Sequence, residues 1–590
     1  MTRKILLIIA LIGSNYLWSQ SDTTKISRIR YPDEPEIAIK KRSPFAIAGT
    51  IGITYEHYGL IKYPETYSGF RQRRPWHQVR FNCLPTIKYG KWSIPVNFSF
   101  PVFATNFASP YTGIKDQSIK QWLSNPSNNL GVSPQYKWAQ LLLGTQYIKY
   151  SELSTGDIGI FGAGFDLRPK GFLAKFFIGN SQQGINYVAS PLPGTTGAFK
   201  RSHYMFQVGK EKEKKYLFAL NFSQGKDHVN SVTTPPLTVK PQEGFVLSLL
   251  ADLYSKSGWY VKTEAAQSYF TKDLTQPFSP LPETSFKPFI VGKTSTQTDF
   301  ATNVSVGRKN KKFDIGYTTK YIGGGFQTTG YPYKQPDHWD NTIDTRFDAW
   351  KKKMNVVASV GVRTNNMSNA SLRSEIFIGN LNWFTQFNDQ VSLNLSYNNF
   401  GFTAESGTNP FAVKNVSNDI GISPNFIFTD SLMMHLIICS YNYSKYDERD
   451  VTLGTITSNN THTALISYNP TFFNHEISPE LSVLYFNNTM PLVKITFTTL
   501  TTGVSMPLWK KHIKLRGQLQ YTLGTLNGFT PNNNFSPSIN IDYNVTKKII
   551  WTNFFSYNYI KYGNELFPQP YLYGANYQEF FFRTNLQYKF

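Results

Sequence analysis

Apolar and polar residues alternate at every second position, and this pattern recurs from residue 45 to the end of the chain. For example, Val79, Phe81 and Cys83 alternate with Arg80 and Asn82. Successive side chains of a β-strand point to opposite faces, so this period predicts strands with one apolar and one polar face. The polar face is mostly Asn, Gln, Ser and Thr, whereas the outward face of a soluble sandwich usually carries many charges. The pattern therefore predicts an all-β transmembrane barrel with lipid outside and water inside.

The composition agrees with a membrane barrel and argues against a nucleic-acid-binding protein. The 590 residues carry a net charge of +23, which by itself suggests phosphate binding. Charged residues make up only 16% of the chain, below the roughly 25% of soluble domains, while aromatic residues make up another 16%. After residue 20 no run of 18 apolar residues predicts a membrane-spanning helix. We therefore expect no nucleic-acid partner.

The N-terminus has the pattern of a secretory signal peptide. Arg3 and Lys4 precede the apolar run 5–13, which is followed by the polar stretch 14–20. The apolar run is too short to span a bilayer. We expect cleavage near residue 20, export, and a final location in the outer membrane. Segment 21–44 is polar and charged, and we expect it to be a periplasmic tail or a partial plug of the lumen, with the barrel formed by 45–590.

Twelve tight, polar or basic turns separate the alternating segments. They lie at 90–91, 137–138, 168–171, 210–215, 255–258, 308–312, 351–353, 388–389, 429–431, 474–475, 510–511 and 546–548. The connections between them are mostly longer, as at 58–77, 103–130, 180–201, 270–298, 322–339 and 561–575. Short periplasmic turns and long extracellular loops are typical of outer-membrane barrels. Together with 45–57 and 577–590, the turns predict an antiparallel up-and-down barrel of about 26 strands (24–26).

The last strand resembles the C-terminal recognition signal of bacterial outer-membrane proteins. Phe582, Leu586, Tyr588 and Phe590 share one face of this strand, and the chain stops on the aromatic residue. The resemblance implies that these side chains form an assembly signal and that the barrel-assembly machinery is a partner.

A second resemblance rests on Ser133-Pro134-Gln135-Tyr136-Lys137-Trp138, Gly144 and the run 162–169, which reads Gly-Ala-Gly-Phe-Asp-Leu-Arg-Pro. The pattern is similar to one that recurs in a family of Bacteroidota outer-membrane β-barrels of unassigned function. It covers roughly 131–179 and the terminal strand, under a fifth of the chain. It implies a location in a Gram-negative cell envelope and supplies no catalytic residues.

Catalytic and metal-binding patterns are absent from the sequence. The nine histidines lie mostly at strand ends or in loops, where we expect them at the surface, and none belongs to a nucleophile motif. Gly323-Gly324-Gly325 leads into Phe326, which indicates a loop or bulge and no phosphate site. The ligands in Asp337-His338-Trp339-Asp340 are adjacent along the chain, so we predict no metal there. We expect no enzyme activity and no cofactor.

The inward face is the better place to look for function. The lumen-lining candidates are Arg80, Lys88, Lys262, Glu264, Asp314, Lys320, Lys514, Arg516, Asp542, Arg583 and Lys589. Amides and hydroxyls around them suit neutral solutes, and the Arg and Lys residues would favour anions. Alternatively, these polar side chains only satisfy solvent and each other.

Geometry makes an open lumen implausible. With strands ~4.8 Å apart and tilted ~40°, 26 strands give a circular barrel roughly 50 Å wide. Such a hole would defeat the outer membrane, so we expect a flattened barrel or a filled lumen, with in-folded loops as the first choice for filling it. A short helix is expected within Asp116–Leu123. The favoured function is a porin-like channel or transporter for small polar or anionic solutes, with a loop-constricted lumen. The alternative is a structural or export-associated barrel that docks periplasmic or surface proteins.

About two thirds of the net charge of +23 lies in the tight turns, on the rim expected to face the periplasm. Basic residues near a membrane surface gain about 1 kcal/mol each from anionic lipids. We therefore expect outer-membrane lipids as partners, and attraction of anionic solutes or a periplasmic protein as the functional alternative.

Overall fold

The computed structural model describes residues 45–590 apart from twelve gaps, which are 63–73, 105–118, 124–127, 157, 188–196, 282–289, 333, 371–372, 407–408, 451–454, 528–530 and 562–575. The expected signal peptide 1–20 and segment 21–44 lie outside the described residues. The chain divides into the units Met1–Phe45 and Ala46–Phe590, and the second unit is the barrel described below.

The barrel wall consists of thirty strand segments. The first fifteen are β1 (Phe45–Ala48), β2 (Thr50–Lys62), β3 (His77–Cys83), β4 (Thr86–Tyr89), β5 (Trp92–Ala104), β6 (Asn129–Val132), β7 (Gln135–Tyr136), β8 (Ala139–Tyr147), β9 (Gly159–Leu167), β10 (Phe172–Gln182), β11 (Lys200–Lys212), β12 (Tyr216–His228), β13 (Glu243–Tyr254), β14 (Trp259–Thr271) and β15 (Thr296–Lys309). The others are β16 (Phe313–Ile322), β17 (His338–Ala349), β18 (Met354–Asn365), β19 (Ser374–Gln386), β20 (Val391–Ser406), β21 (Asn409–Thr429), β22 (Met433–Asp450), β23 (Thr455–Tyr468), β24 (Thr471–Phe472), β25 (Ser478–Thr489), β26 (Lys494–Leu508), β27 (Ile513–Leu526), β28 (Asn532–Asn544), β29 (Ile549–Lys561) and β30 (Tyr577–Lys589).

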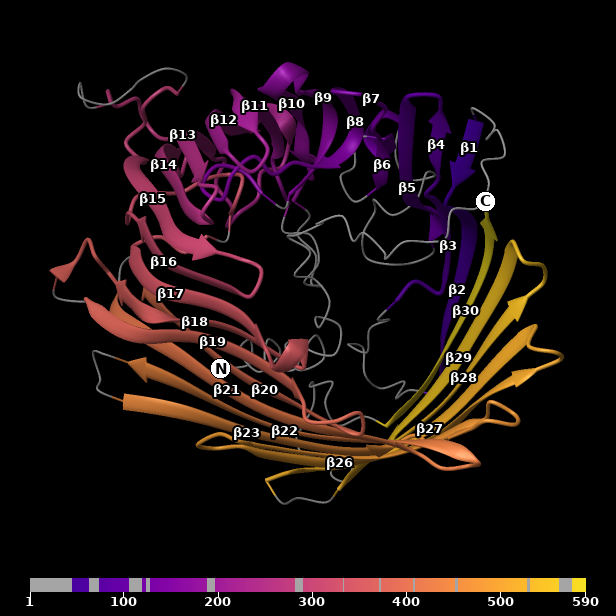
Figure 1. Ribbon diagram of the computed structural model, residues 1–590. Coiled ribbons are helices and arrows are strands. Elements are labelled where there is room, and N and C mark those ends of the chain that lie inside the picture. The colour runs from indigo at the N-terminus through magenta and orange to yellow at the C-terminus, as the bar shows by residue number, and fades with distance from the viewer. Residues whose placement is uncertain are drawn as a thin grey trace. The chain divides into compact units, whose positions relative to one another are not determined.

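When the segments of each interrupted strand are counted together, each strand pairs antiparallel with the next one along the chain, and β2 pairs with β30 to close the ring (Figure 1). Four strands of the wall are interrupted and therefore appear as two segments each, namely β1–β2, β3–β4, β6–β7 and β23–β24. The thirty segments therefore form a closed barrel of 26 strands, which confirms the predicted fold and strand count.

Three of the interruptions lie among the first four strands of the barrel, with the continuous strand β5 between β3–β4 and β6–β7. Gly49 separates β1 from β2 with φ +130°, Leu84-Pro85 separates β3 from β4, and Ser133-Pro134 separates β6 from β7. The two prolines lack the N–H that a strand interior would use for pairing. Val96 N–H donates to Pro85 O at 2.8 Å, so the ladder resumes directly beside the break. The register continues across these two breaks with no inserted residue, since Cys83 and Thr86 pair with Phe98 and Pro95, and the two faces of the wall are therefore kept.

All twelve predicted tight turns join consecutive strands at one rim of the barrel. Lysines occupy left-handed backbone positions in several of them, as at Lys137 (φ 49°) and Lys170 (φ 48°). At the other rim the connections are mostly long between β2 and β19, as predicted, whereas 490–493, which was not among the predicted long connections, links β25 to β26 with four residues. In that later part of the barrel the strands themselves are longer, with 21 residues in β21 and 18 in β22.

Short helices add little to the fold. The expected helix in Asp116–Leu123 is present as α2 (Ile119–Leu123), and 116–118 lie outside the described residues. Trp122 of α2 is buried and packs edge-on against Phe100 of β5, with ring centroids 4.9 Å apart. Three single-turn 3₁₀ segments, η2 (Pro169–Gly171), η3 (Val229–Ser231) and η4 (Trp350–Lys352), lie in the connections. Of the helices in the described ranges, none is long and apolar enough to cross a membrane.

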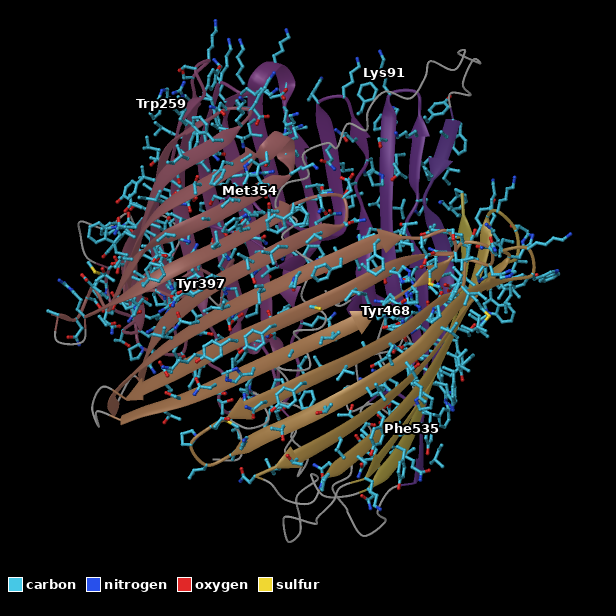
Figure 2. The ribbon with its side chains drawn as sticks, turned by 60° about the horizontal axis from the view of Figure 1, so that its bottom comes forward. Lys91, Trp259, Met354, Tyr397, Tyr468 and Phe535 are labelled. Carbon is cyan, nitrogen blue, oxygen red and sulfur yellow. The ribbon has the colours of Figure 1, made fainter. Side chains whose placement is uncertain are left out.

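The two faces of the wall differ in chemistry, and side chains project from both (Figure 2). On β13, Ser248 faces the inside of the barrel, whereas Leu249 faces outward and is 64% exposed. Ile343 on β17 and Ile466 on β23 also face outward, with 57% and 61% exposure. Large apolar side chains on the outside of a closed barrel face lipid, as the period-two pattern predicts.

Candidate functional site on the inner wall

The strand register places every lumen-lining candidate from the sequence on the inner face. They are Arg80 on β3, Lys88 on β4, Lys262 and Glu264 on β14, Asp314 and Lys320 on β16, Lys514 and Arg516 on β27, Asp542 on β28, and Arg583 and Lys589 on β30. They are spread over six strands of the wall and do not converge on one compact site. A role for any of them toward a solute stays a prediction.

Several of these charges have an opposite charge beside them. In register across neighbouring strands lie Lys262 with Asp252 and Lys514 with Asp542, and ion pairs join Lys309 to Asp314 at 3.3 Å and Arg583 to Glu56 at 3.1 Å. Directly opposed side chains on one face have Cβ atoms about 4.5–5.5 Å apart, close enough to interact. The carboxylates therefore offset the cations that, in the sequence alone, favoured anionic solutes.

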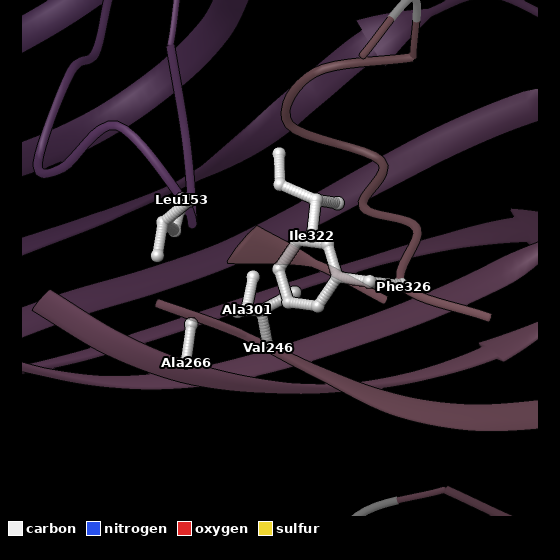
Figure 3. Close-up of a cluster of buried hydrophobic side chains, with 6 residues drawn as sticks. All are labelled: Leu153, Val246, Ala266, Ala301, Ile322 and Phe326. Carbon is white, nitrogen blue, oxygen red and sulfur yellow. The ribbon is translucent and has the colours of Figure 1, made fainter. Parts of the chain in front are cut away.

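Two connections from the rim opposite the tight turns fold onto the inner wall. The first, 148–158, joins β8 to β9, and the second, 323–337, joins β16 to β17. Leu153 and Phe326 are 0% and 1% exposed, and they meet in one buried apolar cluster (Figure 3). The wall contributes Val246, Ala266, Ala301 and Ile322, from β13, β14, β15 and β16. The inner face thus carries an apolar patch that the two loops cover together.

The two loops also bind each other. The Thr328 hydroxyl donates to Ser154 O at 2.8 Å, and the Tyr331 hydroxyl donates to Ser151 O at 3.1 Å. A Cβ at Gly330 would lie 2.5 Å from Ser154 O, closer than any real side chain allows. Only glycine permits the two backbones to approach this closely. The loops therefore form one unit, which we call the loop pair (148–158 and 323–337).

A row of buried polar side chains holds the loop pair to the wall. Gln207 on β11 donates to Asn221 on β12 at 2.6 Å, and Asn221 donates to Ser248 on β13 at 2.9 Å. Gln207 also donates to the backbone oxygen of Tyr150 in the first loop at 3.2 Å. These three wall side chains are at most 3% exposed. Buried amides cost free energy when they lack partners, so this row favours the position in which the loop lies against the wall.

A lysine of the second loop also contacts the first loop. Lys334 Nζ donates to the backbone oxygen of Glu152 and lies 4.7 Å from the ring centroid of Tyr331. Burial, followed by repulsion from Lys320 on the wall, lowers the pKa of Lys334 to about 8. The Glu152 carboxylate in turn accepts a hydrogen bond from Asn303 on β15 at 3.2 Å. This part of the loop pair combines a hydrogen bond with a titratable charge.

Some predictions about single residues need correction. His203 and His338 are buried, 0% and 4% exposed, on the inner sides of β11 and β17, so the expectation of surface histidines is wrong for both. The predicted loop at Gly323–Gly325 begins the second loop of the pair, where Gly325 N–H donates to Asp299 at 2.8 Å. In the part of the chain that the structure describes, no group of three His, Cys, Asp or Glu side chains could hold a metal ion.

Comparison with known proteins gives no relative by sequence. No family model and no curated protein matches the chain. Among solved structures, OccAB4 of Acinetobacter baumannii matches with a TM-score of 0.27 and 8% identity, covering 64% of this chain and 98% of that one. The translocation pore of the P pilus usher (PapC) matches with a TM-score of 0.35 and 9% identity, covering 92% and 100%. A bacterial polysaccharide outer membrane secretin gives 0.24 and 11%, covering 51% and 92%. At these values no solute or partner can be transferred.

The wall itself indicates the location. A closed barrel leaves no strand edge unpaired, which is the condition for β-structure to cross lipid. Tryptophans mark the rim that bears the tight turns, namely Trp92, Trp138, Trp259, Trp350 and Trp509, each at least 45% exposed. Aromatic girdles at this depth flank the apolar band of outer-membrane barrels. The chain is an outer-membrane β-barrel.

The sequence did not reveal the first loop of the pair or the buried polar row. Loop 148–158 is only eleven residues long and was not among the long connections. Its one signal is the run Ser151–Gly156, where alternation stops and small polar residues prevail. Gln207, Asn221 and Ser248 occupy inward positions like many other amides and hydroxyls, so nothing in their spacing marks them as buried.

Proposed function

We propose that this protein is an outer-membrane channel or transporter for small polar solutes, with a lumen narrowed by its own loops. The observation that carries the proposal is the loop pair, which is fixed to the inner wall of β11–β16 by an apolar cluster and by hydrogen bonds. A circular ring of 26 strands would be roughly 50 Å wide. Such a passage is narrowed when loops fold inward, and these two connections lie against the inner wall and do not extend away from the rim.

Paired charges on the inner wall favour neutral solutes within this class. Amide and hydroxyl side chains offer hydrogen bonds to any polar molecule, whereas selectivity for anions needs rings of unpaired Arg or Lys. The pairing of Lys514 with Asp542 and of Arg583 with Glu56 weakens such a field. We therefore infer a passage with weak charge selectivity.

Single-channel recording of the purified full-length protein in planar bilayers tests the proposal. We expect discrete conductance steps, with a reversal potential near zero in a KCl gradient. Replacing 323–337 by a short Gly-Ser turn should enlarge the steps, and a variant shortened between β18 and β19 controls for the loss of an external loop. A barrel that stays silent in the bilayer, in the native form and without 323–337, would contradict a channel.

The second candidate is a structural or export-associated barrel that docks other proteins. One observation favours it, namely the apolar side chains exposed on connections at the rim opposite the tight turns. Leu237 is 70% exposed, Phe278 67% and Val291 57%. A silent barrel that co-purifies with a stoichiometric protein, and loses it when these three side chains become serine, would establish this alternative in place of the channel.

Assembly and orientation are part of the proposal. Phe582, Leu586 and Tyr588 lie on the outward face of β30, and Phe590 N–H donates to Gly49 O at 3.0 Å. We infer that the barrel-assembly machinery recognises the outward face of β30 together with Phe590, so deletion of Phe590 should lower the yield of folded barrel. An epitope within 561–575 should be labelled on intact cells, and one at Lys311 should not. The opposite labelling would invert the orientation.

A further inference from the structure

A groove on the outward face of the wall crosses β10–β14 close to the tight turns. It is a shallow, open groove of about 710 Å³, lined mainly by apolar side chains. Three small residues, Ala251 on β13 and Thr263 and Ala265 on β14, occupy outward positions where neighbouring strands carry larger groups. Phe172 on β10 and Phe218 on β12 stand beside them. The groove is therefore a gap in the outward layer of side chains, with aromatic rings along its side.

The surroundings of the groove are those of a lipid-facing surface. Phe172, Phe218 and Leu249 are 48%, 45% and 64% exposed, all on the outward face. Lipid tails are as apolar as these side chains, so a chain seated in the groove is held by van der Waals packing and not by removal of apolar area from water. In a membrane the molecule available to fill an apolar groove in the wall is a lipid acyl chain.

The charges beside the groove are sorted by the strand period. In Lys210-Glu211-Lys212 at the end of β11, both lysines face outward, and the glutamate faces the inside of the barrel. Lys210 lines the groove, opposite Phe172 and Phe218 in register. Glu211 is engaged on the inner side by Arg168 Nη1 at 3.1 Å. The outward face of β11 thus presents two lysines next to the apolar groove, and the carboxylate between them points to the inside of the barrel.

We propose that this groove binds one acyl chain of an anionic phospholipid of the periplasmic leaflet, with the lipid phosphate at Lys210. The site uses van der Waals packing for the chain and charge complementarity for the headgroup. Each Lys near an anionic membrane surface strengthens the attraction about fivefold. The proposal requires that the tight-turn rim faces the periplasm, and it is independent of whether the barrel conducts.

Native mass spectrometry of the full-length protein in detergent, with added phosphatidylglycerol or phosphatidylcholine of identical acyl chains, tests the proposal. We expect one phosphatidylglycerol to remain bound at collision energies that remove phosphatidylcholine. Ala251→Phe fills the groove and should abolish retention of both lipids. Lys210→Gln should lower the retention of phosphatidylglycerol about fivefold and leave phosphatidylcholine unchanged.

Matched controls separate the groove from general lipid contact. Ala358→Phe adds the same ring to the outward face of β18, and Lys311→Gln removes one charge from another turn at the same rim; both should retain lipid as the native protein does. Heat-modifiable migration on gels shows whether each variant is folded. Equal retention of the two lipids by the native protein, or unchanged retention in folded Ala251→Phe, would overturn the site. A dimer that Ala251→Phe separates would assign the groove to a second copy of the chain and also overturn it.

Discussion

Removing the Phe326 side chain should release both loops of the pair at once. Phe326 is 1% exposed and packs in the cluster that joins Leu153 of the first loop to the wall. Truncation of a buried Phe to Ala typically costs 3–5 kcal/mol, and the barrel itself keeps its ladder pairing. We therefore expect the cost to appear as local opening of the loops and not as unfolding of the barrel.

The size of the expected change in exchange rate follows from the contacts that hold the loop pair closed. The hydrogen bonds from Thr328 and Tyr331 contribute about 1 kcal/mol each, so they cannot replace the apolar contact. A loss of about 3 kcal/mol raises the open population roughly 100-fold, because every 1.4 kcal/mol is tenfold. Amide hydrogen exchange reports this population directly when closing is fast. Both 148–158 and 323–337 should therefore exchange roughly 100-fold faster in Phe326→Ala, with larger conductance steps in planar bilayers.

The control is Phe377→Ala, which removes an identical ring from the outward face of β19, where it is 48% exposed. This variant should leave the exchange of both loops unchanged. Faster exchange confined to 323–337, with 148–158 still protected, would refute the reasoning, because it would mean that the first loop is held by the wall alone.

Three further outcomes are expected. The pKa of Lys334 is lowered to about 8 in the closed loops, so the charged form of this side chain opposes closure. The closed state should therefore become more stable as pH rises from about 8 toward 10, and the conductance should fall over this range. Lys334→Met should abolish this pH dependence. Backbone amides of 129–136 should exchange faster than those of β21, because β6 and β7 are four and two residues long; equal protection would contradict this. Residue 519 points to lipid, and Leu519→Arg should destabilise the folded barrel by about 2–4 kcal/mol if it lies near the midplane of the bilayer. Gln518→Arg on the inner face should cost little, and urea titration measures both. A larger cost for Gln518→Arg would mean that the inner and outer faces are assigned the wrong way round.

Much of the fold follows from local sequence because a β-barrel is built from local rules. Alternation assigns each strand residue to one of two faces, and the register confirms this for strands as far apart as β3 and β30. The tight turns are visible because hairpins need short polar connections. Their positions set the number of strands, and closure requires that number to be even when both ends lie at the same rim.

The split strands were less visible, since the register continues across each proline break and the alternation does not change there. Ser133-Pro134 shows this well. The sequence predicted the tight turn at 137–138 in this segment, and the structure in addition divides the strand before it into β6 and β7 at Ser133-Pro134. Only the positions of the other breaks, at Gly49 and Leu84-Pro85, show that the irregularities lie together among the first four strands of the barrel.

By itself, the sequence determined the class of the barrel, the number of its strands, the rim that bears the turns and the face on which each strand side chain lies. The tertiary structure alone decided where the loops go and which polar residues are buried. Gln207 and Asn221 are ordinary lumenal amides by pattern, and they become a fixed row because the Tyr150 backbone oxygen, on a loop more than fifty residues away in the chain, accepts a hydrogen bond from Gln207. Contacts between Ser154 and Thr328 span 174 residues. Periodicity reports the direction of a side chain from its own strand, whereas burial depends on which distant segment arrives opposite it.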